Sequence, residues 1–307
     1  PSKRLAKIEN KLIRNFYLRI WIFLSKKNKS LNYYFFSSQN NNKENLNCNY
    51  IFSNVRPGEN LDKKVFLSLK ENGIIIFKNL LSKKEHDKII KRFDDLNYNE
   101  EKINNNWLKG PSDITKSKFI RLLWGMDDIE KYPELKMVSK QITKEIYGKE
   151  VVPTSEFFWH KPLQLPEELI KGENHLHMDR FIPNIKMYYS PFKINESDAP
   201  FKWVLGSHKI TDEYINYWKN SKNFDEIEDE QKGLKYIKNI NKNKEIQAVL
   251  EANSLIAVFT NGLHCRSPFL NKEGNRKVVF LHYGAFNKLS LFDFKKYNLN
   301  KNNTTFK

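Results

Sequence analysis

Two side chains that can bind a metal stand two residues apart in the segment His177-Met178-Asp179. Because alternate side chains of a β-strand face the same way, His177 and Asp179 point into one space while Met178 turns away. A third ligand from a distant strand, His264, completes a face of two imidazoles and one carboxylate. This ligand set suits Fe(II) and leaves open positions for a cosubstrate and O2. The pattern predicts a metal centre of His177, Asp179 and His264.

The sequence around this triplet has a regular order of strands and turns. The run Ile185 to Tyr189 is strand-like, and a Gly206-Ser207-His208 turn follows it. The segment Ala252 to Phe259 reads as a turn that enters a buried strand. His264 comes just after that strand, and Arg276 opens a further strand. Strands that return after long excursions are typical of a jelly roll.

This series of motifs resembles the phytanoyl-CoA dioxygenase family of Fe(II)/2-oxoglutarate-dependent oxygenases, over about residues 66–286. A strand after Gly73 also matches the family. Leu205 stands where the family commonly has proline, and Asn253 replaces a glycine, although Asn tolerates a left-handed turn. The resemblance implies a mainly β fold with packing helices, a cupin-like double-stranded β-helix. It also implies Fe(II), 2-oxoglutarate as cosubstrate and O2.

The distal carboxylate of 2-oxoglutarate needs a cation. Arginine suits this role because its planar fork donates two parallel hydrogen bonds to a carboxylate. Arg276 is predicted to supply it, and Arg266, only two residues past His264, is the rival. Tyr188 could add a hydroxyl to the same site.

Among the seven histidines, His175 competes most directly with the predicted ligands, because it shares their strand face. The resemblance selects His177 and Asp179. His208 belongs to the Gly-Ser-His turn and is expected to pack, and His160 could face the cavity.

The predicted reaction is hydroxylation, because Asp179 keeps the carboxylate that similar halogenating oxygenases lack. The substrate is expected to be a small, possibly anionic molecule related to lipids, acyl thioesters or glycans. Candidate contacts are Arg180, Lys186, Arg266 and Trp159. The alternative is a jelly-roll binding module or a metal-binding cupin without 2-oxoglutarate turnover. In the sequence, only Arg276 separates the two.

The chain of 307 residues carries a formal net charge of +17. This surplus favours an anionic partner, but a composition rich in Lys, Asn and Ile on a solvated surface is the simpler explanation. No basic stripe is interleaved with aromatic residues, so nucleic acid is not expected as a partner. No apolar run is long enough to span a membrane, and two cysteines make no disulfide framework. A cytoplasmic location is expected, and the sequence does not indicate an oligomeric state.

Three regions are predicted. Residues 1–50 hold a basic amphipathic helix and a polar linker, residues 51–290 the oxygenase domain with a helical insert at about 208–245, and residues 291–307 a polar tail. The first helix could lie on an anionic membrane or pack on the domain, and its removal is expected to spare catalysis. Ser82 and Glu85 form a capping-box pattern at the start of a later helix.

Overall fold

The chain is described by a computed structural model. It describes residues 11–27, 29–36, 49–53, 55–95, 119–148, 150–162, 176–179, 181, 183–220, 245–270 and 276–283. The polar linker, the C-terminal tail, most of the charged insert, and the side chains of Trp159 and Arg180 lie outside the described part.

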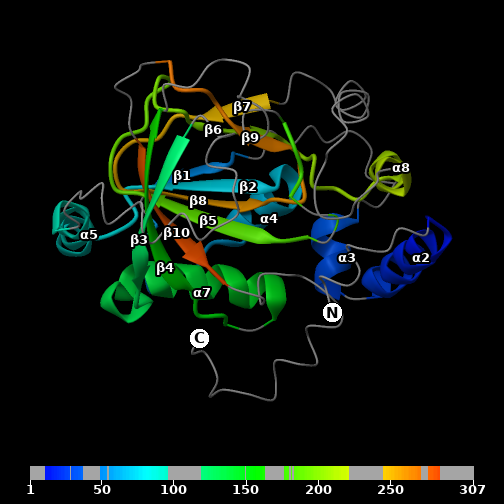
Figure 1. Cartoon of the computed structure of the whole chain (residues 1–307). Coiled ribbons are helices and arrows are strands. Elements are labelled where there is room, and N and C mark those ends of the chain that lie inside the picture. The colour runs from blue at the N-terminus through cyan, green and yellow to red at the C-terminus, as the bar shows by residue number, and fades with distance from the viewer. Residues whose placement is uncertain are drawn as a thin grey trace.

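A seven-stranded sheet forms the centre of the fold (Figure 1), with the strand order β1-β2-β8-β5-β10-β4-β3. Its neighbouring strands are antiparallel, except for the parallel pair β1 and β2. The strands are β1 Ile51–Ser53, β2 Ile74–Lys78, β3 Phe119–Asp127, β4 Thr154–Pro162, β5 Ile185–Ser190, β8 Ser254–Phe259 and β10 Arg276–His282.

A smaller sheet lies against one face of the large one (Figure 1). It has the order β7-β6-β9, with β6 Phe201–Val204, β7 Glu245–Ala248 and β9 His264–Arg266. On the free side of β9, His177 pairs with His264 through an isolated antiparallel bridge. Two facing sheets connected in this way make a jelly roll, which confirms the predicted fold class.

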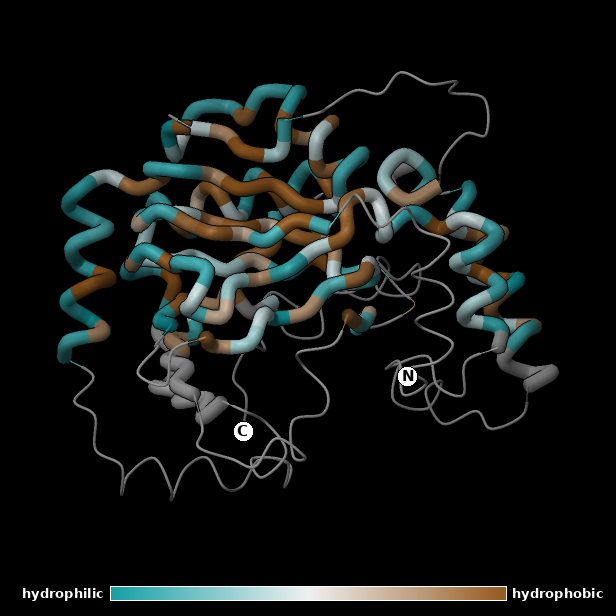
Figure 2. Tube along the Cα trace, turned by 90° about the horizontal axis from the view of Figure 1, so that it is seen from above, coloured by the Kyte–Doolittle hydropathy of each residue, from teal (hydrophilic) through white to brown (hydrophobic). Residues whose placement is uncertain are grey.

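The strands alternate between two cores, as their period of two requires. On β5, Tyr188 packs in the core between the two sheets, together with Trp203 and Val258. Its neighbours Met187 and Tyr189 pack in the core between the large sheet and the helices. Figure 2 shows the strands as the most hydrophobic tubes at the middle of the molecule. This alternation decides which side chains reach the space between the sheets.

Helices cover the outer face of the large sheet and one end of the molecule (Figure 1). They are α2 Lys11–Lys27, α3 Lys29–Phe35, α4 Lys63–Asn72, α5 Lys83–Asp95, α7 Pro133–Tyr147 and α8 Asp212–Asn220, with a short 3-10 helix η2 at Ile129–Lys131. Gly73 and Gly148 end α4 and α7 in left-handed conformations. Within the described residues, no helix has both the length and the apolar character needed to cross a membrane.

Candidate metal centre

The backbone brings the two halves of the predicted metal centre together. His177 and His264 exchange two backbone hydrogen bonds, each of 2.8 Å. The amide of Asp179 donates to the carbonyl of Thr260 at 2.9 Å. The H-x-D segment was expected to be a strand, but it forms only this single bridge. The pairing is still enough to place all three predicted ligands at one edge of the small sheet.

The donor atoms of His177, Asp179 and His264 all lie within 4.8 Å of one another. Asp179 Oδ1 is 3.4 Å from His264 Nε2 and 3.8 Å from His177 Nε2. The side chain of His264 is 7% exposed, while those of His177 and Asp179 are 29% and 20% exposed. The cluster is therefore held on its buried side and open on the other.

The tautomer of His264 follows from its second nitrogen. Nδ1 lies 2.8 Å from the carbonyl oxygen of Gly262. Because a carbonyl only accepts, Nδ1 carries the proton and donates it, which leaves the Nε2 lone pair aimed at the cluster. In the neutral ring, Nε2 and Asp179 Oδ1 are then two acceptors that face each other. Such a donor set fits a bound cation between them.

Asp179 is ionised in this environment. Burial alone would raise the pKa of its carboxyl group, but the nearby ammonium of Lys186 opposes this effect, and the pKa is held well below its usual value. Lys186 Nζ lies 2.6 Å from Asp179 Oδ2. A carboxylate that stays charged is what metal coordination requires.

The Gly-Ser-His turn supports the segment that leads to His264. Ser207 Oγ accepts a hydrogen bond of 2.8 Å from the amide of Leu263, and Asn261 Nδ2 donates to the carbonyl of His208 at 2.9 Å. His208 itself is fully buried, and its Nε2 donates to the carbonyl of Lys70. His208 therefore packs, as predicted, and does not reach the metal centre.

An aromatic row leads from the metal centre across the space between the sheets. The ring of Phe201 stacks on His264 with centroids 5.6 Å apart. Tyr188 lies 6.2 Å from Phe201 and stacks on Phe280 at 5.1 Å. This places Tyr188, a predicted cofactor contact, in the wall between the metal centre and β10.

Both candidate arginines are buried. Arg276 is 6% exposed, and its Nη1 donates to the carbonyl of Ala199 at 2.8 Å. Arg266 is 8% exposed and lies on the same face of β9 as His264, two residues away. Ala199 has a φ of 55°, a left-handed conformation that costs a non-glycine residue about 1 kcal/mol. The carbonyl of Ala199, in this left-handed conformation, is the group that accepts the hydrogen bond from Arg276.

Sequence reasoning missed the role of several residues around the ligands. Lys186 was expected to contact substrate, yet it is paired with Asp179. Asn184 and Thr260 hold the start of β5 beside the Asp179 loop, with a backbone bond of 2.8 Å and a side-chain bond of 3.2 Å. The dipeptide Asn261-Gly262, shortly before His264, was a local signal that a tight turn precedes the ligand.

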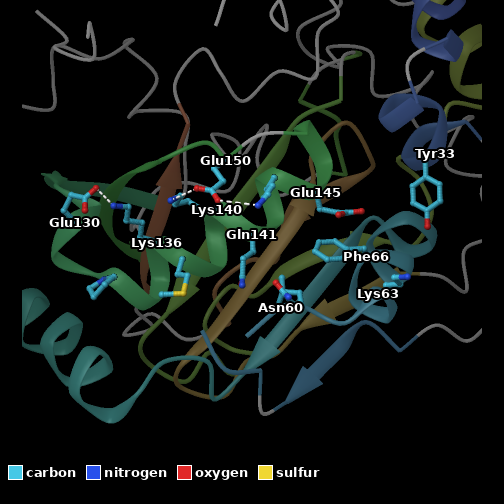
Figure 3. A pocket seen from close by; sticks show the side chains of 14 residues that line it. Tyr33, Asn60, Lys63, Phe66, Glu130, Lys136, Lys140, Gln141, Glu145 and Glu150 are labelled. Atoms are coloured by element: carbon cyan, nitrogen blue, oxygen red, sulfur yellow. Dashed lines mark hydrogen bonds and ion pairs between the residues drawn. The ribbon is translucent and has the colours of Figure 1, made fainter. Parts of the chain in front are cut away.

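A groove lies along α7 and the start of α4 (Figure 3). This groove has a volume of about 850 Å³ and is lined by α7, the start of α4 and Tyr33. The lysines of α7 in it are paired with acids: Lys136 with Glu130, and both Lys140 and Lys144 with Glu150. None of the predicted site residues lines it, so the groove is separate from the metal centre.

Three solved structures illustrate the structural likeness of this chain. The non-heme alpha ketoglutarate dependent carbocyclase SnoK from nogalamycin biosynthesis has 14% identity and a TM-score of 0.47, with 78% of this chain and 92% of that chain covered. The apo form of EctD from S. alaskensis has 12% identity and a TM-score of 0.46, with 80% and 84% covered. HygX from Streptomyces hygroscopicus, with nickel, 2-oxoglutarate and hygromycin B bound, has 10% identity and a TM-score of 0.43, with 74% and 90% covered.

No family model and no curated protein sequence matches this chain. The resemblance to phytanoyl-CoA dioxygenases in particular therefore stays a prediction. At the identities found, the solved structures say nothing about which substrate this chain acts on.

Proposed function

We propose that this chain is an Fe(II)- and 2-oxoglutarate-dependent oxygenase that hydroxylates a small, anionic organic substrate. The observation that carries the proposal is the cluster of His177, Asp179 and His264, whose donor atoms lie within 4.8 Å of one another. Two imidazoles and one carboxylate are the ligand set typical of non-haem Fe(II) oxygenases. When bound, Fe(II) and 2-oxoglutarate supply the oxidising power that inserts oxygen from O2 into a C–H bond.

The residues of the chain bind and orient. His177, Asp179 and His264 hold the metal on one face, and Gly262 fixes the ring of His264 through Nδ1. Arg276 receives the distal carboxylate of 2-oxoglutarate, because its buried guanidinium suits a two-pronged contact. Tyr188 lines the space between them. The aromatic row of Phe201, Tyr188 and Phe280 keeps that space poor in water.

The charges around the centre favour an anionic substrate. Lys186, Arg266 and Arg276 supply three cations, and Asp179 supplies one anion. Arg276 is assigned to the cosubstrate, so Arg266 on the face of His264 is the proposed substrate contact. Trp159 and Arg180 remain predicted contacts from the sequence. Lipids, acyl thioesters and glycan-related molecules that carry a phosphate or carboxylate group would suit such a site.

We assign the protein to a reducing, cytoplasmic compartment, where Fe(II) and 2-oxoglutarate are available. Cys265 is free and buried beside His264, and a persistent free thiol suits such a compartment. Peripheral contact with an anionic membrane through α2 belongs to the same proposal, because the outer side of α2 exposes Phe16 and Phe23 next to basic side chains.

The competing function is a metal-binding cupin without 2-oxoglutarate turnover. The buried guanidinium of Arg276 favours the oxygenase, since a plain cupin has no need of it. The test is succinate release from 2-oxoglutarate by the Fe(II)-loaded protein, with and without candidate anionic substrates. Release that requires Fe(II) and is lost in Asp179→Ala supports the oxygenase. Metal binding without any succinate release, across the substrate panel, favours the cupin.

A further inference from the structure

The two oxygens of the Asp179 carboxylate face different partners. Oδ1 is the oxygen that faces His177 Nε2 and His264 Nε2, at 3.8 Å and 3.4 Å. Oδ2 lies 2.6 Å from Lys186 Nζ. At this distance the two ionised groups form a close ion pair, and their attraction is strong where water is partly excluded. Lys186 therefore pairs with Oδ2, the carboxylate oxygen that does not face the imidazoles.

The backbone fixes Lys186 and Asp179 against each other. Lys186 is the second residue of β5, where its Cα pairs with Val258 in the middle of the large sheet. The amide of Asp179 donates to the carbonyl of Thr260, and the amide of Thr260 donates to the carbonyl of Asn184. Both partners of the ion pair are thus tied to the same few residues. The pair is also only partly exposed, at 26% for Lys186 and 20% for Asp179.

This arrangement limits how Asp179 can bind a metal. A carboxylate that binds with both oxygens takes two coordination positions, and one that binds with a single oxygen takes one. A bidentate 2-oxoacid and O2 together need three open positions. A cation on Oδ2 keeps that oxygen from the metal and preserves the third position. The same ammonium adds a positive charge next to the metal, which favours anionic co-ligands.

The geometry points to Lys186 as a positioning residue that holds Asp179 as a one-oxygen ligand and makes the metal centre select anionic co-ligands. This inference rests on the proposed function, since it needs a metal at His177, Asp179 and His264. It assigns to Lys186 a role different from the substrate contact that the sequence predicts.

The test measures two binding constants on the full-length chain, one for Co(II) and one for oxalate on the Co(II)-loaded protein. Oxalate is a dianion that chelates a metal but lacks the chain needed to reach a distant arginine, so it reports on the centre alone. Lys186→Met removes the charge and keeps the length of the side chain. We expect oxalate binding to weaken roughly tenfold, because a nearby cation is lost, while Co(II) binding is not weakened, because that cation repels the metal.

Lys202→Met is the matched control. Lys202 is also a strand lysine in an ion pair, 3.0 Å from Glu245, but it lies outside the metal cluster. This variant should leave both constants unchanged. Lys186→Gln, a second neutral variant with a polar end, should repeat the effect of Lys186→Met and guards against a folding failure.

Three results would overturn the inference. Unchanged oxalate binding in both neutral variants would show that the charge does not act. Parallel weakening of Co(II) and oxalate binding would reduce Lys186 to a structural role. A wild-type chain that binds no Co(II) would overturn the proposed function itself, which the first two results would leave standing.

Discussion

Asp179 and Arg276 have different roles in the proposed site: one at the metal, the other at the distal carboxylate of 2-oxoglutarate. Asp179 lies with the two histidines in a cluster that could hold a metal ion. Arg276, the first residue of β10, donates a hydrogen bond to the carbonyl of Ala199. Its guanidinium is therefore oriented before any ligand binds. A preorganised cation loses less entropy on binding than a mobile one.

The role of Arg276 makes the first prediction. Arg276→Ala should weaken 2-oxoglutarate binding by about 2–5 kcal/mol, the usual loss for a buried charge-assisted pair, and leave Fe(II) binding nearly intact. Arg276→Lys should recover only part, because an ammonium cannot form the two-pronged contact. The measurement is calorimetric titration of the anaerobic Fe(II) protein with 2-oxoglutarate.

Arg266→Ala is the matched comparison, because Arg266 is buried to a similar extent. It should change 2-oxoglutarate affinity little. A large loss in Arg266→Ala with none in Arg276→Ala would transfer the cosubstrate role to Arg266.

His175 and His177 are the two histidines that the sequence offers beside Asp179. The structure places His177 in the cluster, and His175 lies outside the described residues. The sequence could predict the H-x-D pair because strand alternation is a local rule. It could not predict that Lys186 pairs with Asp179, because that contact depends on how β5 and the Asp179 loop meet across Thr260.

At the scale of elements, the ligand His264 depends on the turn before it. A Cβ atom at Gly262 would lie 2.3 Å from the ring of Trp203 and 2.8 Å from the backbone nitrogen of His208. Trp203 is fully buried, so it cannot move aside easily. The close contact of this turn with β6 therefore requires glycine.

Gly262→Ala should lower the free energy of unfolding by about 1–3 kcal/mol through overpacking. It should also weaken metal binding, because the carbonyl of Gly262 orients His264. Denaturant unfolding and metal titration measure the two effects.

Gly148→Ala is the control: a Cβ there meets nothing within 4 Å, but φ is 70°. It should cost about 1 kcal/mol of backbone strain and leave metal affinity unchanged. Equal metal affinities in both variants would contradict the role of the Gly262 turn.

The start of α5 shows what a local pattern can and cannot give. Ser82 Oγ accepts from the amide of Glu85, as the capping box predicts, at 3.4 Å. The carboxylate of Glu85 instead accepts from the amides of Glu134 and Leu135 at the start of α7, and that of Glu134 accepts from the amide of Ser82. Side chains of α5 and α7 thus accept hydrogen bonds from backbone amides at the start of the other helix. The sequence predicted the start of α5, but the contact of Glu85 with α7 depends on how the two helices pack in the folded protein.

At the scale of the whole molecule, α2 joins the main core. Leu18 and Trp21 are buried, and the ring of Trp21 meets Phe181 edge-on, with centroids 4.8 Å apart. Phe181 lies two residues after Asp179. The expectation that removing the N-terminal helix spares catalysis is therefore revised: its loss would uncover the core next to the metal loop.

The outer face of α2 can be tested without removing its inner face. Phe16 and Phe23 are 63% and 58% exposed, and Lys27 lies over the ring of Phe23 at 4.4 Å. Apolar side chains bordered by cations suit an anionic lipid surface. Flotation with phosphatidylserine vesicles at low salt should carry the wild-type protein, and the double variant Phe16→Ser, Phe23→Ser should lose it.

Leu270→Ser is the control for that experiment, since Leu270 is 72% exposed and far from α2 in the sequence. It should float like the wild type. Absence of flotation in the wild type would leave α2 as a packing helix only, and the net charge of +17 as a feature of composition.

The proposed function requires that His177, Asp179 and His264 hold one Fe(II) to which 2-oxoglutarate binds. The most direct measurement is an anaerobic titration of the wild type, His177→Ala, Asp179→Ala and His175→Ala with Fe(II) and then 2-oxoglutarate, followed by metal content and metal-to-ligand charge-transfer absorption. We expect one Fe(II) per chain and a 2-oxoglutarate-dependent band in the wild type and in His175→Ala, and neither in the other two variants. Stoichiometric iron with an intact band in His177→Ala and Asp179→Ala, or no band in the wild type, would contradict the proposed function.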